Sequence, residues 1–261
     1  MKGIINIGNS CYLNAALQLL FNSHDFYNIC SNSQLYDSIK EYKSTQTNNF
    51  NPSNVKALLD KRTDIFKGSY QQDSFEVIIY LLDLVNQKEL YNHFGIHTSI
   101  NVKCKMIKCL HESEHIENDL MLTLPISSNL SDSYRQYKSY ERLENENAYQ
   151  CDHCKAKTIG RKRIEIVKWP ENLIIVLKRF DSNMRKNSSN IMIPLEWRHG
   201  YKLMGGIIHM GNFNGGHYIY YGYNNIKDHW FIANDSNINI INMEKLNEII
   251  QQSYILYYVM N

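Results

Sequence analysis

The chain has 261 residues and a formal net charge of +2, with 43% hydrophobic and 21% charged residues. These fractions are those of an ordinary globular protein with a buried core. The small net charge argues against a nucleic-acid binder, and no stretch approaches the roughly 18 apolar residues of a membrane span. The N-terminus lacks the apolar stretch of a signal peptide, which predicts an intracellular protein.

The first hundred residues are predicted to be mainly helical. Apolar side chains follow Cys11 at helical spacing, so a helix is expected to begin at or just before this residue. A shorter helix is expected over Ser53 to Phe66, and a strongly amphipathic one starts near Gln71.

From Ile100 onward the pattern changes to short runs rich in β-branched and aromatic residues, so the second half is predicted to be mainly sheet. The expected strands are Leu120 to Ile126, Ile164 to Lys168, Leu173 to Phe180, Tyr201 to Met210, His217 to Tyr223, Trp230 to Ala233 and Ile255 to Val259. Ser182 to Asn190 is expected to be a polar loop, and Ser127 to Asn147 a long or partly mobile excursion. No linker divides the chain, which predicts a single domain over residues 1–261.

Cys11 is the first candidate catalytic residue. The exposed amides at a helix start carry partial positive charge, which lowers a thiol pKa and enriches the nucleophilic thiolate. Cys30 has no such context. Gly8 allows a tight turn before the thiol, and Asn6 offers an amide for the oxygen of a tetrahedral intermediate. A purely structural cysteine is the alternative.

His217 is the candidate general base. It follows Gly215 and Gly216, which would let an extended substrate backbone pass close by. Asn234 and Asp235 lie one hairpin later, where either side chain could orient the imidazole. A turn histidine and an ordinary Asn-Asp-Ser turn are the alternatives. Together the thiol, the imidazole and the amide or carboxylate predict a thiol-dependent protease.

Several motifs together resemble the ubiquitin-specific protease family. Residues 3–14, Gly-Ile-Ile-Asn-Ile-Gly-Asn-Ser-Cys-Tyr-Leu-Asn, are similar to its cysteine box. The motifs similar to its histidine box are Tyr201-Lys202-Leu203, His209-Met210-Gly211, Gly215-Gly216-His217-Tyr218, Trp230, Asn234-Asp235-Ser236 and the closing run from Ser253 to Tyr258. Gln71 to Glu76 and Leu177 to Phe180 are similar to further family signatures. The resemblance spans nearly the whole chain in the family's order.

The resemblance implies an α+β, papain-like fold with a helical thumb (about 1–99), fingers (about 100–163) and a β-rich palm (about 164–261). It implies a monomeric deubiquitinase that cleaves after the C-terminal glycine of ubiquitin and needs no cofactor for catalysis. Cys11 would be the nucleophile and His217 the general base and acid. Asn6 would donate to the oxyanion, and Asn234, ahead of Asp235, would orient the imidazole.

The resemblance also implies residues that bind the substrate tail. Asp73 would grip the extended ubiquitin tail, whose arginines suit a carboxylate. Gln72, Gly215, Gly216 and Tyr218 are the other expected contacts. The alternative is that Gln71 to Asp73 merely begins a helix, since Asp is favoured in a first turn.

Two cysteine pairs predict a structural zinc. Cys151 and Cys154 form a CxxC knuckle, and Cys104 and Cys109 form a looser pair with four residues between them. Many family members carry such a site, but here Met106 falls where the leading cysteine of the first knuckle is expected. Cys104 would then substitute for it, or His111 would contribute, or the metal has been lost. Four thiols without a metal are the remaining alternative.

Three competing functions stay open. The chain could be a catalytically silent ubiquitin-binding module, or a protease for a ubiquitin-like modifier or an unrelated peptide. The third, a zinc-dependent nucleic-acid binder, fits poorly with the near-neutral charge. The many Asn, Ile, Lys and Tyr residues are typical of an AT-rich genome, such as that of a virus or parasite.

Overall fold

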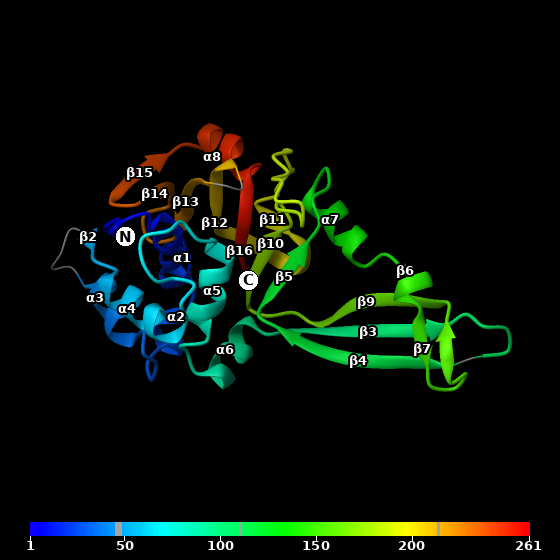
Figure 1. Cartoon of the computed structure of the whole chain (residues 1–261). Helices are drawn as coiled ribbons and strands as arrows, with labels where there is room; N and C mark the ends of the chain where they lie inside the picture. The colour runs from blue at the N-terminus through cyan, green and yellow to red at the C-terminus, as the bar shows by residue number, and fades with distance from the viewer. Residues whose placement is uncertain (45–48, 110, 213–214) are drawn as a thin grey trace.

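The computed structural model describes residues 1–44, 49–109, 111–212 and 215–261. A helical region packs against one side of a large sheet, and a long, narrow extension of strands projects from the other side (Figure 1). This arrangement confirms the predicted α+β class. In the described part of the chain, no helix is long and apolar enough to cross a membrane.

The described part of the first hundred residues contains six helices, which confirms the prediction of a mainly helical region, although the sequence analysis named only three of them. The six helices are α1 (Cys11–Asn22), α2 (Phe26–Ile29), α3 (Tyr36–Lys43), α4 (Ser53–Arg62), α5 (Ser74–Leu82) and α6 (Gln87–Phe94). Helix α1 is buried along nearly its whole length. Helix α5 begins three residues later than expected because Asp73 is its N-cap, and the Asp73 carboxylate accepts a hydrogen bond from the Phe75 amide.

The main sheet has the strand order β15-β14-β13-β12-β16-β10-β5, with β11 paired to β12. Its strands are β5 (Met121–Leu124), β10 (Asn172–Leu177), β11 (Glu196–Trp197), β12 (Tyr201–Asn212), β13 (Gly215–Asn224), β14 (His229–Asn234), β15 (Asn237–Ile241) and β16 (Ser253–Met260). Strand β13 alternates between two cores: Tyr218 and Tyr220 face the cluster that contains α1, while Ile219 and Tyr221 face the opposite cluster. The sheet therefore has an apolar core on both faces.

The extension is a second sheet with the order β4-β3-β9-β6. Its strands are β3 (Ile96–Cys104), β4 (Glu112–Asp119), β6 (Glu141–Leu143) and β9 (Gly160–Lys168), and the hairpin of β7 (Tyr149–Cys151) and β8 (Ala156–Thr158) lies at its tip. A small parallel pair, β1 (Gly3–Ile4) and β2 (Asn49–Phe50), lies near the N-terminus. The predicted strand over 164–168 is part of the longer β9.

The structure corrects the expectation of an irregular excursion over 127–147. Helix α7 (Leu130–Tyr137) lies in this segment, capped by the Asn129 side chain, with Leu130 and Tyr134 buried. Strand β15 and helix α8 (Met243–Ile250) were likewise not predicted. Each of these elements is short and buries at most three residues, so it leaves little hydrophobic pattern in the sequence.

Arg179 fixes the loop that follows β10. The side chain is 1% exposed and donates hydrogen bonds to four backbone carbonyls, those of Asn187, Ser189, Gln251 and Ser253. Burial lowers the pKa of its guanidinium to about 10. The polar loop expected over Ser182 to Asn190 is therefore folded around one buried cation and tied to the start of β16.

Candidate active site

Cys11 lies at the first position of α1, with its side chain only 3% exposed. Burial raises the pKa of its thiol above the ordinary value, and a backbone hydrogen bond from Tyr218 opposes that rise. The amides at the helix start act in the expected direction but are outweighed by desolvation. The sequence-based expectation of a lowered thiol pKa is therefore wrong for the resting site.

The hydrogen bond from the Tyr218 backbone places the Cys11 sulfur beside the start of β13. Tyr218 directly follows His217 in this strand. His217 in turn lies 2.7 Å, from Nε2 to Oδ1, from the side chain of Asn234 at the end of β14. Because Oδ1 of an amide can only accept, Nε2 carries the proton and Nδ1 keeps its lone pair. The geometry selects the tautomer that a general base needs.

Asp235 contacts other groups than the imidazole. Its carboxylate accepts hydrogen bonds from Asn6 Nδ2 at 2.9 Å and from Asn14 Nδ2 at 2.7 Å. Its backbone carbonyl accepts the Ile4 amide at 2.8 Å. Asp235 thus ties the N-terminal segment and α1 to the β14–β15 turn, where its own φ is +51°.

Asn6 is held on both sides of its side-chain amide. Oδ1 accepts from the backbone amides of Gly8 and Ser10, while Nδ2 donates one hydrogen to Asp235. The amide nitrogen has a second hydrogen that none of these bonds uses. All five predicted catalytic residues therefore meet where the start of α1, the start of β13 and the end of β14 converge.

Most of the predicted substrate-binding residues line a hollow of about 330 Å³. It is lined by Gln71, Gln72, Asp73, Glu76, Phe180, His209, Gly215 and Tyr218. Asp73 is fixed there by the Tyr254 hydroxyl, at 3.1 and 3.0 Å from its two oxygens, and burial raises the pKa of its carboxyl group. Asp73 therefore caps α5, as the helix-start alternative holds, and also lines the hollow; its role in tail binding stays a prediction.

Gln71 is a site residue that the sequence analysis did not single out. Its side-chain amide bonds to both backbone groups of Gly216, with Nε2 2.9 Å from the carbonyl oxygen and Oε1 2.9 Å from the amide nitrogen. It bridges the segment before α5 to the residue before His217. Gln72, the predicted contact, instead donates to the Ile65 carbonyl at 2.8 Å. Two adjacent glutamines give no sequence signal of which one faces the cleft.

His209 is a second residue missed by the sequence analysis. Its ring packs against Tyr218 at 4.6 Å between centroids, with the ring planes tilted by 46°, and meets Phe180 edge-on at 5.4 Å. Burial lowers the pKa of its imidazole to about 4, with Lys186 and His217 adding to the effect. It is thus a neutral wall of the hollow, and Gly216 fits only because it lacks a Cβ, which would lie 2.3 Å from His209 Nε2.

The four cysteines at the tip of the extension form one cluster, and all are free thiols. The Sγ atoms of Cys104 and Cys154 lie 4.0 Å apart, and those of Cys109 and Cys151 lie 3.8 Å apart. Four sulfurs bound tetrahedrally to zinc at about 2.3 Å would be about 3.8 Å apart. A hydrogen bond from Thr158 lowers the pKa of Cys104 to about 6, which favours the thiolate. The cluster therefore fits a zinc ion.

Cys104 completes the cluster in place of the leading cysteine, which the family's spacing would put at Met106. Met106 is 48% exposed and lies outside the cluster. His111 is also outside it and stacks on Tyr149. Cys104 lies at the end of β3, and four residues separate it from Cys109.

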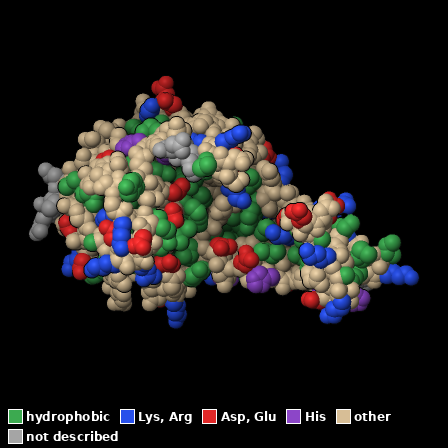
Figure 2. All heavy atoms as spheres, viewed as in Figure 1, with side chains coloured by type: hydrophobic (Ala, Val, Ile, Leu, Met, Phe, Trp, Pro, Cys, Tyr) green, Lys and Arg blue, Asp and Glu red, His purple; other side chains and the backbone are tan. Residues whose placement is uncertain are grey.

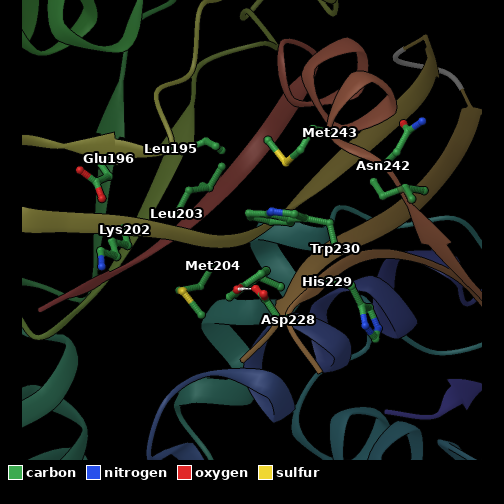
Figure 3. Close-up of a pocket in the computed structure, with 12 residues that line it drawn as sticks. Leu195, Glu196, Lys202, Leu203, Met204, Asp228, His229, Trp230, Asn242 and Met243 are labelled. Carbon is green, nitrogen blue, oxygen red and sulfur yellow. Dashed lines mark hydrogen bonds between the residues drawn. The ribbon is translucent and has the colours of Figure 1, made fainter. Parts of the chain in front are cut away.

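A larger hollow of about 560 Å³ lies on another part of the main sheet (Figure 3). Leu203 and Trp230, which belong to the core cluster opposite α1, line it together with Met204 and Met243. None of the predicted catalytic or tail-binding residues reaches it. The space-filling view shows a separate depression between the helical region and the base of the extension (Figure 2).

Comparison with known proteins gives consistent matches. The family model for ubiquitin carboxyl-terminal hydrolase matches residues 2–258. The chain is 27% identical to ubiquitin C-terminal hydrolase 15 of Oryza sativa subsp. japonica and 28% identical to ubiquitin carboxyl-terminal hydrolase 15 of Arabidopsis thaliana, each over 99% of the chain. These alignments cover 31% and 33% of the two relatives, so the chain spans about a third of their length.

Two solved structures share the fold. One is the SAGA DUB module of Ubp8, Sgf11, Sus1 and Sgf73 bound to monoubiquitin, with a TM-score of 0.82 and 22% identity over 100% of this chain and 69% of that chain. The other is the same module bound to ubiquitin aldehyde, with a TM-score of 0.83 and 21% identity over 100% of this chain and 70% of that chain. The likeness confirms the predicted papain-like fold class with its thumb, palm and fingers.

Proposed function

Since the chain belongs to the ubiquitin carboxyl-terminal hydrolase family, we propose that it is a thiol-dependent deubiquitinase acting through an acyl-enzyme on Cys11. The observation that carries the proposal is the 2.7 Å contact between His217 Nε2 and Asn234 Oδ1, beside a thiol held at the start of α1. This contact leaves Nδ1 of the imidazole as the base. The bond cleaved is the isopeptide or peptide bond after the C-terminal glycine of ubiquitin.

The reaction follows from the positions of these groups. His217 Nδ1 takes the Cys11 proton, and the thiolate attacks the glycine carbonyl. The developing oxyanion receives hydrogen bonds from the free N–H of Asn6 and from the Cys11 backbone amide. His217 then protonates the leaving amine, and water, activated by the same imidazole, releases ubiquitin from the thioester. Asp235 acts as a positioning residue because it holds Asn6.

The hollow lined by Asp73 accounts for recognition of the substrate tail. A carboxylate fixed by Tyr254 suits an arginine of an extended tail. The Gln71 amide holds the two backbone groups of Gly216 that an extended peptide would otherwise pair with. Entry of the tail therefore exchanges the Gln71 contacts for substrate contacts next to His217.

A ubiquitin that carries an electrophile at its C-terminus tests this proposal directly. The wild-type protein is expected to form a covalent adduct at Cys11, and Cys11→Ala none. His217→Ala is expected to slow adduct formation by at least a hundredfold, since the thiol loses its base. Binding of the probe without any adduct in the wild-type protein would contradict the proposal and favour a silent ubiquitin-binding module.

The same experiment distinguishes ubiquitin from ubiquitin-like proteins as the substrate. Probes built on ubiquitin and on ubiquitin-like proteins are mixed with the enzyme in competition, and ubiquitin is expected to react first. Faster reaction of another modifier would identify a protease for that modifier instead. No specific feature of the described residues favours either alternative over ubiquitin.

We further propose that Cys104, Cys109, Cys151 and Cys154 hold a structural zinc. Their separations match a tetrahedral sulfur site, and the bound metal would cross-link the end of β3 to the β7–β8 hairpin. A monomeric state and an intracellular location stay predictions from the sequence.

A further inference from the structure

A second group of metal-binding side chains lies far from the cysteine cluster along the chain. His24 and Asp25 lie between α1 and α2, and Glu171 directly precedes β10. One ligand atom from each of these residues lies within 4.8 Å of the other two. His93, from α6, contacts the same glutamate. Neither the proposed reaction nor the cysteine cluster uses any of these residues.

The distances fit a shared metal ion better than a hydrogen bond. His24 Nδ1 lies 3.4 Å from Asp25 Oδ2 and 3.3 Å from Glu171 Oε1. A charge-assisted N–H···O bond would be about 2.7–2.9 Å, and one N–H shared between two carboxylates would make two longer, weaker bonds. Nitrogen and oxygen ligands about 2.0–2.1 Å from a tetrahedral zinc lie about 3.4 Å apart, close to the two separations found here.

The charges of the group favour a cation. Two carboxylates face one nitrogen, and in the described part of the chain neither forms an ion pair with a Lys or Arg. A cation between the two carboxylates, either a protonated His24 or a metal ion, relieves their mutual repulsion. Asp25 is also the N-cap of α2; its side chain makes no capping hydrogen bond, and its Oδ1 accepts from Asn28 Nδ2 at 3.3 Å, while Oδ2 faces His24.

The buried Tyr257 hydroxyl fixes the backbone segments that carry this group. The buried Tyr257 hydroxyl accepts the His24 amide at 2.7 Å and donates to Asn172 Oδ1 at 2.7 Å, so one hydroxyl fixes the segments that carry His24 and Glu171. Glu171 Oε2 lies 3.1 Å from His93 Nδ1, the kind of outer contact that orients a metal-bound carboxylate. These contacts preorganise the group before any metal arrives.

We propose that His24, Asp25 and Glu171 bind a zinc ion, with water completing its coordination and His93 as a positioning residue. The ligands come from the helical region and from the edge of β10, so the ion would join the two parts of the molecule that also form the active site. The site is partly exposed, with side-chain exposures of 51% for His24 and 41% for Glu171. We therefore expect it to bind more weakly than the four cysteines and to exchange its metal.

The test counts zinc ions on the whole, metal-free protein by isothermal titration. The wild type is expected to bind two zinc ions per chain, and His24→Ala and Glu171→Gln only the tighter one. His93→Ala should retain both with the weaker affinity lowered at least tenfold. His115→Ala, which alters an exposed histidine paired with Glu117 in the extension, is the matched control and should behave as wild type.

Absorption spectra with cobalt(II) distinguish the two sites in the wild-type protein, so this measurement does not depend on whether a variant folds. The first equivalent should show the charge-transfer absorption of thiolate ligands, and the second should add only the weaker bands of nitrogen and oxygen ligands. Zinc at a hundred times the weaker dissociation constant should raise the Tm of the wild type by roughly 5 °C more than that of His24→Ala. Equal stoichiometry and equal Tm shifts in the two proteins would overturn the proposal.

Discussion

At the scale of single residues, the candidate site depends on how burial and hydrogen bonds compete. Cys11 lies where helix amides favour a thiolate, yet desolvation dominates and keeps the resting thiol protonated. His217 therefore has to supply the base, and Asn234 decides which imidazole nitrogen is available for it.

The raised pKa of Cys11 predicts a pH dependence. In His217→Ala, alkylation of Cys11 by iodoacetamide should increase with pH, with a midpoint above the pKa of about 8.5 of a free cysteine. The sign follows because burial disfavours the charged form, so more alkaline solution is needed to ionise the thiol. Peptide mapping by mass spectrometry follows Cys11 separately from the other thiols, and a midpoint below 8 would contradict this explanation.

Asp73→Asn separates the two roles of this residue. Asparagine is as good an N-cap as aspartate, so the free energy of unfolding should change by less than about 0.5 kcal/mol. The charge is lost, however, and kcat/KM for a ubiquitin substrate should fall roughly 10–100-fold, mainly through KM. An unchanged KM would show that Asp73 is only a helix cap.

Wild-type affinity for the tail should also fall in acid. Burial raises the pKa of Asp73, so its carboxylate becomes protonated at a higher pH than an ordinary aspartate would. Binding of a ubiquitin C-terminal peptide should weaken as the pH falls through that raised pKa. In Asp73→Asn this loss of affinity should be absent, which fluorescence titration across pH would reveal.

At the scale of elements, the start of β13 is packed against β12 so closely that only glycine fits at position 216. A Cβ there would lie 2.2 Å from the Met210 carbonyl oxygen and 2.3 Å from His209 Nε2. Close packing at this point holds His217 and Tyr218 against the start of α1. The position of the imidazole is thus set by the hairpin that precedes it.

Gly216→Ala should therefore lower the Tm by roughly 3–9 °C, because overpacking of this kind costs about 1–3 kcal/mol. The matched control is Gly215→Ala, where the nearest atom to the new Cβ is Gln71 Oε1 at 3.4 Å. Its Tm should change by less than 2 °C. Thermal unfolding followed by circular dichroism compares the two, and equal Tm values would show that the hairpin relaxes freely.

At the scale of the whole molecule, the extension depends on its own small core. The strands β3, β4, β6 and β9 form a separate sheet, and among the described residues its tip buries little more than Cys104, Cys109, Cys151 and Thr158, with Tyr149 and Cys154 partly buried. Such a small core buries little apolar surface, so a bound zinc would be a main source of its order.

Removal of zinc by a chelator should therefore loosen the tip and leave the catalytic region intact. Amide hydrogen exchange should accelerate over residues 104–109 and 149–158, while α1 and β13 keep their protection. Cys151→Ser should give the same pattern without chelator. Unchanged exchange at the tip in both experiments would show that four free thiols suffice there.

The sequence by itself determined most of the long, strongly patterned elements and singled out the candidate reacting groups. Helix α1 and strands such as β12, β13 and β16 were predicted because apolar periodicity over many residues has one structural solution. It did not determine α7, α8 or β15, nor the longer strands β3 and β4, because α7, α8 and β15 are short and bury at most three residues and β4 is exposed along nearly its whole length. The order of these patterns along the chain predicted a mainly helical first part and a strand-rich second part, and the resemblance to the family implied the α+β, papain-like class.

Only the tertiary structure decided how the site works. Gln71 and Gln72 are neighbours of the same residue type, and Asn234 and Asp235 are neighbours that could each orient the imidazole. They turn to different partners because the local backbone points each in its own direction. The pKa of Cys11, the choice of Cys104 over Met106, and the meeting of His24 with Glu171 likewise depend on burial and on distances between segments far apart in the chain. A sequence lists chemical groups, and only folding sets their solvation and separation.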